Sequence, residues 1–318
     1  MRFKSVGLAL LTTLVILAIG LYNFRSISDW LILRSYSPSS QVISLADETT
    51  MQDQARRLFY VNRPSIDEKQ EFNEHCPKNT EKTIVLGCFT SPRGIYLLHV
   101  DDPRLTGVMQ VTAAHELLHS EYERLSSKER SRVDNMVSSA YEQIDNSHIK
   151  TTIESYRKSG ADVTNELHSI LGTEVSNLPP DLETYYAGYF KDRSKIVDSS
   201  RSYEKAFEDL KNQVSQDDKQ LAELKSTIEN NQNRLKGMGQ SIDEERGRMD
   251  QLLSSKQIDE YNKSVPTFNQ KVKDYNVLVG ETKQLINQYN DLVDKRNSVV
   301  TQQQQLYKAI DSSNLTSK

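Results

Sequence analysis

The strongest constraint on the fold of this chain is an apolar residue at every seventh position over most of its C-terminal third. The repeat runs without a miss from 207 to 249 and resumes from 258 to 300. A seven-residue apolar repeat sustained over more than three heptads predicts helices that pair along one seam. The repeating residues are Phe207, Val214, Leu221, Ile228, Leu235, Ile242 and Met249, then Ile258, Val265, Val272, Val279, Ile286, Val293 and Val300.

The two heptad series are separated by a short polar stretch at 253–256, which is a plausible turn. Helices of similar length joined by a short connection fold back on each other. We therefore expect an antiparallel coiled-coil hairpin over 196–311 and a frayed tail at 312–318. Pro266 is expected to kink or restart the second helix. The alternative is a parallel homodimer that breaks near this proline.

Polar residues recur within the first seam, at Asp217, Asn231 and Glu245. Polar groups in a seam weaken packing and tend to fix register or partner number. The hairpin is expected to bind a protein partner or to self-associate, and the alternative is a passive stalk.

The N-terminus has the composition of a membrane anchor. Arg2 and Lys4 precede an apolar run from 6 to 22, which is near the lower length limit for crossing a bilayer. We expect an uncleaved signal-anchor helix over 1–25, with the bulk of the chain extracytoplasmic. Cleavage after Gly20, which would give a secreted protein, is the alternative. The segment 30–33 that follows is suited to the membrane interface, because it opens with a tryptophan.

Cys76 and Cys88 are the only cysteines in the chain. A pair so spaced, beyond a membrane segment, predicts a disulfide that closes a small loop and forms only outside the cytoplasm. Two free buried thiols are the alternative. Upstream, residues 45–61 are expected to form one short helix that ends before Pro64.

A metal-binding pattern lies in the middle of the chain. His115 and His119 are four residues apart in a segment, 106–125, whose apolar spacing predicts a helix. Both imidazoles then lie on one face and can reach one ion. Glu116, between them, is placed to take a proton from a water molecule bound to that ion. Residues 94–100 are rich in strand-forming residues and are expected to precede this helix as a strand.

Residues 95–190 resemble the zincin metallopeptidases, and the Asn165–Glu166 pair resembles the second metal helix of the gluzincin group. The resemblance implies a small α+β domain, here 26–195, with an edge strand that holds extended substrate, and a Zn²⁺ ion held by His115, His119 and Glu166. The metzincin pattern fits less well, because 120–125 contains no third histidine. His168 is the alternative third ligand, and Glu174 is a weaker rival.

The chain departs from the gluzincin pattern at Ile170, where those enzymes carry an acid that orients a metal-bound histidine. Asp162, Ser169 or a backbone carbonyl is expected to replace it. Among the aromatic residues that follow, Tyr185, Tyr186 and Tyr189 are candidates for an oxyanion donor, although core packing is the stronger expectation. His75 and His99 are expected to be structural or exposed.

The whole chain is therefore expected to be mainly α-helical and to function as a membrane-anchored, extracytoplasmic zinc endopeptidase acting on protein or peptide substrates. A net charge of −4 without a basic block argues against nucleic-acid binding. One alternative is a non-catalytic cell-envelope scaffold or adhesion protein built on the coiled coil. Another is an enzyme that cleaves peptidoglycan cross-links.

Overall fold

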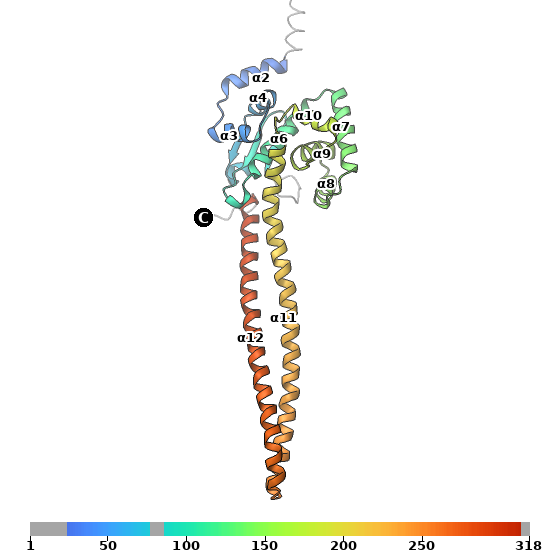
Figure 1. Cartoon of the computed structure of the whole chain (residues 1–318). Coiled ribbons are helices and arrows are strands. Elements are labelled where there is room, and N and C mark those ends of the chain that lie inside the picture. Colours follow the sequence, from blue (N-terminus) through green and yellow to red (C-terminus); the bar gives the residue numbers. More distant parts are fainter. Residues whose placement is uncertain (1–23, 77–85, 313–318) are drawn as a thin grey trace, which may run out of the picture. The chain divides into compact units, whose positions relative to one another are not determined.

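The computed structural model describes residues 24–76 and 86–312 and is mainly helical, with one small sheet and two long C-terminal helices (Figure 1). It divides into two compact units, the first made of residues up to 206 together with those from 306 onward, and the second of residues 207–305. The first unit contains α2 (Phe24–Ser35), α3 (Ser40–Glu48), α4 (Asp53–Val61), β1 (Ser65–Asp67), α5 (Lys69–His75), β2 (Gly87–Phe89), β3 (Ile95–Leu98), the 3-10 helix η1 (Pro103–Leu105), α6 (Val108–Arg124), α7 (Ser127–Glu142), α8 (Ser147–Ser159), α9 (Val163–Glu174) and α10 (Pro180–Ala187).

The three strands lie in the order β1-β3-β2, with β1 parallel and β2 antiparallel to β3. The strand expected over 94–100 is therefore present as β3, but the expectation that it is an edge strand is wrong. It lies in the centre because Ile95, Leu97 and Leu98 are all buried, which favours pairing on both sides. The outer strand that packs against α6 is β2.

The single helix expected over 45–61 is instead two helices, α3 and α4. Between them Thr50 adopts a positive φ of 55° and Met51 forms a bridge with Phe190. The amide of Gln52 donates to the carbonyl of Tyr189 at 2.7 Å. These contacts with a segment far along the chain supply backbone partners that a continuous helix would have provided locally.

The core of the first unit is built around α6, and its closest neighbour is α9. At Gly172 in α9, a Cβ atom would lie 2.4 Å from Leu118 Cδ1 and 2.8 Å from the ring of Tyr186. Glycine is therefore required for α9 to approach α6 this closely. Both helices carry candidate metal ligands, so this contact sets the distance between them.

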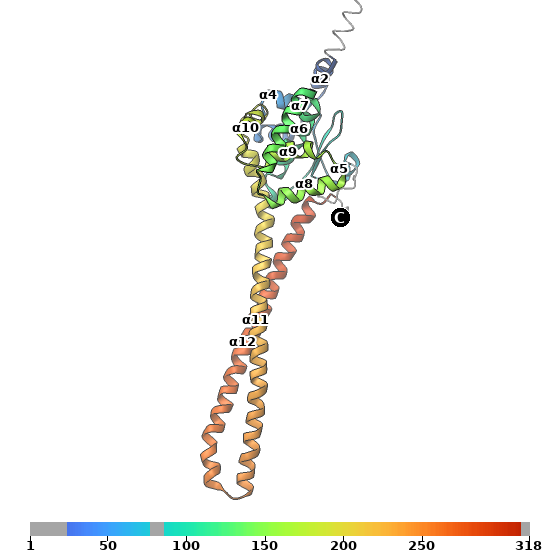
Figure 2. The same ribbon diagram turned by 90° about the vertical axis from the view of Figure 1, so that its right-hand side faces the viewer.

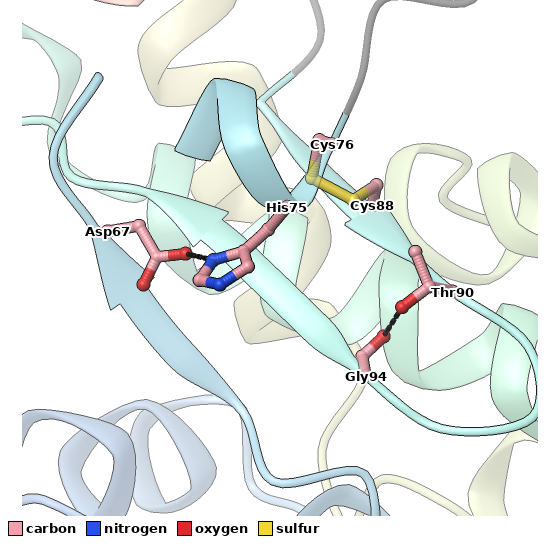
Figure 3. The surroundings of a disulfide bond; sticks show 6 residues. All are labelled: Asp67, His75, Cys76, Cys88, Thr90 and Gly94. Carbon is pink, nitrogen blue, oxygen red and sulfur yellow. Dashed lines mark hydrogen bonds and ion pairs between the residues drawn. A yellow bond between two sulfur atoms is a disulfide. The ribbon is translucent and has the colours of Figure 1, made fainter. Parts of the chain in front are cut away.

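Cys76 and Cys88 form the expected disulfide, which joins the residue after α5 to β2 (Figure 3). Beside it, His75 donates from Nδ1 to Asp67 Oδ2 at 2.7 Å and stacks on Tyr96. His99 likewise lies 2.7 Å from Glu68. Both histidines therefore make local structural contacts.

The two long helices are α11 (Ser194–Ser254) and α12 (Ile258–Ile310), joined by a turn at 255–257. Within the second unit they run antiparallel side by side (Figures 1 and 2), as ion pairs across the seam show. Fully buried Asp217 pairs with Lys295 at 2.9 Å, and Glu245 pairs with Lys271 at 3.0 Å. The polar seam residues Asp217 and Glu245 therefore have cross-helix partners, which favours this register over shifted ones.

The restart expected at Pro266 does not occur, because α12 continues through this residue without interruption. Val265 and Phe268 on either side are half-buried, and their packing stabilises the flanking turns.

The anchor predicted over 1–25 lies outside the described residues except for Phe24 and Arg25, which begin α2. No helix within 24–76 or 86–312 has both the length and the apolar composition needed to cross a bilayer. The tail predicted at 312–318 is likewise described only at Ser312, whose carbonyl accepts from Asn73 at 2.7 Å.

Candidate metal centre

Two helix segments bring the candidate ligands together. His115 and His119 lie on adjacent turns of α6, and Glu166 lies in the first turn of α9. The start of α9 is fixed by Asp162, whose carboxylate accepts from the amides of Thr164 and Asn165 at 3.2 Å each. This N-cap determines which residues of the first turn face α6.

The three ligand side chains converge on one point. His115 Nε2 and His119 Nε2 are 3.0 Å apart, and each lies 3.7 Å from Glu166 Oε2. Tetrahedral zinc with bonds of about 2.0 to 2.2 Å holds its ligand atoms roughly 3.3 to 3.6 Å apart. The observed separations are close to this range, so small side-chain shifts would seat one ion.

Glu166 Oε2 is buried and has no hydrogen-bond partner among the described residues. An unpartnered carboxylate oxygen is costly in a protein interior. Because this oxygen faces two imidazole nitrogens, a bound cation would satisfy it. The side chains of His115, His119 and Glu166 remain 15%, 11% and 16% exposed, which leaves the group accessible from solvent.

The electrostatics of the group favour an ionised Glu166. Burial raises the pKa of this carboxyl, but the nearby imidazoles of His115 and His119 outweigh it, so the pKa is lowered from its usual value. The carboxylate is therefore in the form that a cation requires.

His119 is oriented by Asn165, which sequence reasoning did not identify as its partner. Asn165 Oδ1 lies 2.9 Å from His119 Nδ1 and accepts a hydrogen bond from its N–H, which directs the Nε2 lone pair toward a metal. The expected replacements do not do this, since Asp162 caps α9 and Ser169 Oγ is buried without a partner in the described chain. Ile170 lies in the core. In the sequence, the one indication of this role was that Asn165 directly precedes the candidate ligand Glu166.

Replacing Asn165 with alanine should weaken zinc binding about 10- to 100-fold, because His119 loses the acceptor that fixes its tautomer and ring orientation. Competition with a chromophoric chelator measures the affinity. Thr164→Ala, one residue earlier in the same helical turn, is the matched control and should bind zinc like the wild type. Equal affinity of the Asn165 and wild-type proteins would show that this contact does not support the ligand.

Glu116 is buried and packs against β2 at Gly87, a strand position that has no side chain. A Cβ atom at Gly87 would lie 2.9 Å from Glu116 Cγ and 3.0 Å from Glu116 Oε1. The same atom would also lie 2.5 Å from Thr112 Cγ2. The space for the Glu116 carboxylate therefore depends on Gly87, a residue that the sequence pattern did not single out.

The three tyrosines considered as oxyanion donors are engaged elsewhere. Tyr185 bonds to His168 Nε2 at 2.9 Å, Tyr186 donates to the carbonyl of His168 at 2.6 Å, and Tyr189 donates to Glu121 at 2.8 Å. Tyr186 and Tyr189 are buried and Tyr185 packs against the core, as the core-packing expectation states. His168 itself is fully buried, and burial together with the charges of His119 and His115 lowers its pKa to about 3. It is not a member of the converging group.

Tyr156 in α8 is an aromatic residue close to the site, because its side chain contributes to the lowered pKa of the Glu166 carboxyl. Nothing in the spacing around Tyr156 indicated this proximity, which depends on the packing of α8 against α9.

A cleft of about 790 Å³ in the first unit lies elsewhere. It is lined by residues of α2, α4, α6 and α7, among them Arg57, Glu121 and Arg132, and none of the three ligands lines it. Convergent donors indicate chemistry more specifically than volume does, so the ligand group is the stronger candidate site.

The chain matches no protein-family model, no curated protein and no solved structure.

Proposed function

We propose that this protein is a membrane-anchored, extracytoplasmic zinc endopeptidase of the gluzincin-like type. The observation that carries the proposal is the convergence of His115, His119 and the unpartnered Glu166 Oε2 on one point. Two imidazoles and one carboxylate are a ligand set typical of catalytic rather than structural zinc.

Zinc held by these three side chains would acidify a water molecule and polarise the carbonyl of a peptide bond. Glu116 acts as the general base that accepts the water proton and later gives it to the leaving amine. His119 keeps its Nε2 toward the site because Asn165 holds its Nδ1 proton. Tyr156 lies near the Glu166 carboxyl and helps to keep it ionised.

The outer strand β2 supplies a place for an extended peptide. Leu98 donates to Leu86 and Thr90 donates to Gly94, so residues 86 and 90 bond to the β3 side. In an antiparallel pair, alternate residues hydrogen-bond to the partner strand, so the backbone groups of Gly87 and Phe89 point away from β3. On that outer side they have no backbone partner among the described residues. A substrate paired at this edge would pass next to Glu116.

Two features support the proposed location. The Cys76–Cys88 disulfide is stable only in an oxidising compartment. The apolar run at 6–22 has the composition of an uncleaved anchor.

Zinc analysis of the purified full-length chain, together with hydrolysis of an unfolded protein such as casein, tests the proposal. We expect about one zinc per chain and chelator-sensitive cleavage. Glu166→Gln should weaken zinc binding by more than about 100-fold, beyond the effect typical of residues that only support a ligand. Glu174→Gln, two turns further along α9, is the matched control and should retain zinc.

Loss of zinc from the Glu174 variant but not from the Glu166 variant would show that the third ligand is misassigned. A wild-type chain that binds no divalent metal, or binds zinc without hydrolysing any peptide, would favour the scaffold alternative.

A further inference from the structure

One side of α2 exposes four large apolar side chains. Phe24 is 67% exposed, Ile27 49%, Trp30 53% and Leu31 54%. Their spacing of three, four and seven residues places them on one side of the helix. On the other side, Ile32 is buried and α2 packs against α4. An apolar stripe this large on a helix that is already docked indicates a second contact surface.

We propose that this stripe rests on a lipid surface, so that α2 fixes how the first unit is oriented at the membrane. The apolar run at 6–22 ends just before α2, which brings the helix next to any bilayer that the run enters. Arg34 lies at the end of the stripe with its guanidinium 5.4 Å from the Trp30 ring. Tryptophan and arginine side by side suit the headgroup region, where the ring is partly apolar and the cation meets lipid phosphate.

The opposite side of α2 is bonded to other elements of the first unit, which contains the candidate metal ligands. Asp29 accepts from Arg124 at 2.7 Å and from Arg93 at 3.4 Å, and Arg93 also donates to Ser28 at 2.7 Å. Arg124 is the last residue of α6, and Arg93 lies between β2 and β3. These bonds connect α2 to the end of α6, the helix that carries His115 and His119, and to the connection between β2 and β3. The α2 helix would therefore set the height and tilt of the candidate site above the bilayer.

The inference goes beyond the proposed peptidase function and rests only on its anchoring part. Trp30 is the only tryptophan in the chain, so all tryptophan fluorescence comes from the face in question. The test uses the full chain in vesicles of mixed phosphatidylcholine and phosphatidylglycerol. Because an interfacial helix buries its apolar face about 5 to 10 Å deep, lipids brominated near the headgroup should quench Trp30 about twofold. Aqueous acrylamide should quench it several-fold less than it quenches free tryptophan amide.

Ile27→Glu should abolish most of the bromolipid quenching by placing a charge within the stripe. Ile43→Glu, an isoleucine in α3 that is 40% exposed, is the matched control and should leave the quenching unchanged. Circular dichroism verifies that both variants are folded.

Three outcomes would overturn the inference. A chain that floats with vesicles while Trp30 remains open to acrylamide keeps its anchor but makes no lipid contact through α2. A chain that does not float disproves the anchoring and the inference together. In the third outcome, bromolipid does not quench Trp30, and Trp30 is protected from acrylamide only until the protein is diluted. This would show that the stripe binds a second copy of the chain. None of these results depends on whether the protein hydrolyses peptides.

Discussion

Replacing Glu116 with glutamine is expected to reduce peptide hydrolysis by about 10²- to 10⁴-fold, the range typical of a lost general base. Glutamine has nearly the same shape as glutamate, so it fits the same buried space beneath Gly87. It cannot accept a proton from water at neutral pH. Zinc content should stay at the wild-type level, because His115, His119 and Glu166 remain in place. The measurement is the initial rate of casein cleavage alongside zinc analysis of the same samples.

Glu123→Gln is the matched control for this experiment. Glu123 lies on the same helix, but it is exposed and its carboxylate accepts from Ser91 at 2.9 Å. Its activity should equal that of the wild type. A Glu116 variant that loses zinc together with activity would show that Glu116 supports the fold of the site. Undiminished hydrolysis by that variant would remove Glu116 from the mechanism.

Replacing Arg193 with methionine should destabilise the first unit by about 2 to 5 kcal/mol, because two buried carbonyls lose their donor at about 1 to 3 kcal/mol each. Arg193 is only 8% exposed. Its guanidinium donates to the carbonyls of Leu171 at 3.3 Å and Val175 at 2.6 Å, at the end of α9, and it also pairs with Glu183. Glu183 is 40% exposed, so the ion pair contributes the smaller part. Most of the loss comes from buried carbonyls left without a donor.

Arg201→Met provides the comparison, because Arg201 lies in the first turns of α11, shortly after Arg193, but its side chain is 59% exposed. This change should cost less than about 0.5 kcal/mol. Urea unfolding followed by far-ultraviolet circular dichroism measures both variants. Since α9 also carries Glu166, the Arg193 variant should bind zinc more weakly at temperatures near its midpoint. A stability equal to that of Arg201→Met would show that water replaces the guanidinium at these carbonyls.

Local patterns predicted much of the architecture. The heptads of 207–300 identified two long helices, because a seven-residue apolar repeat can be buried only along a helix seam. The helix that carries His115 and His119 followed from apolar spacing, and the Cys76–Cys88 bond followed from the presence of only two cysteines. In each case the information lay within a short stretch of sequence.

The errors arose where distant segments meet. The break between α3 and α4 depends on Phe190, and the central position of β3 depends on two partner strands that its own sequence does not specify. Residues 1–23 are outside the described chain, so the membrane anchor stays a prediction.

The sequence by itself determined that two imidazoles share one helix face and that a glutamate stands between them. Only the tertiary structure decided which carboxylate approaches them, how closely, and which side chain orients His119. The reason is physical. Helical periodicity fixes neighbours within a turn, whereas Glu166 and Asn165 reach α6 only because Gly172 lets two helices pack in close contact.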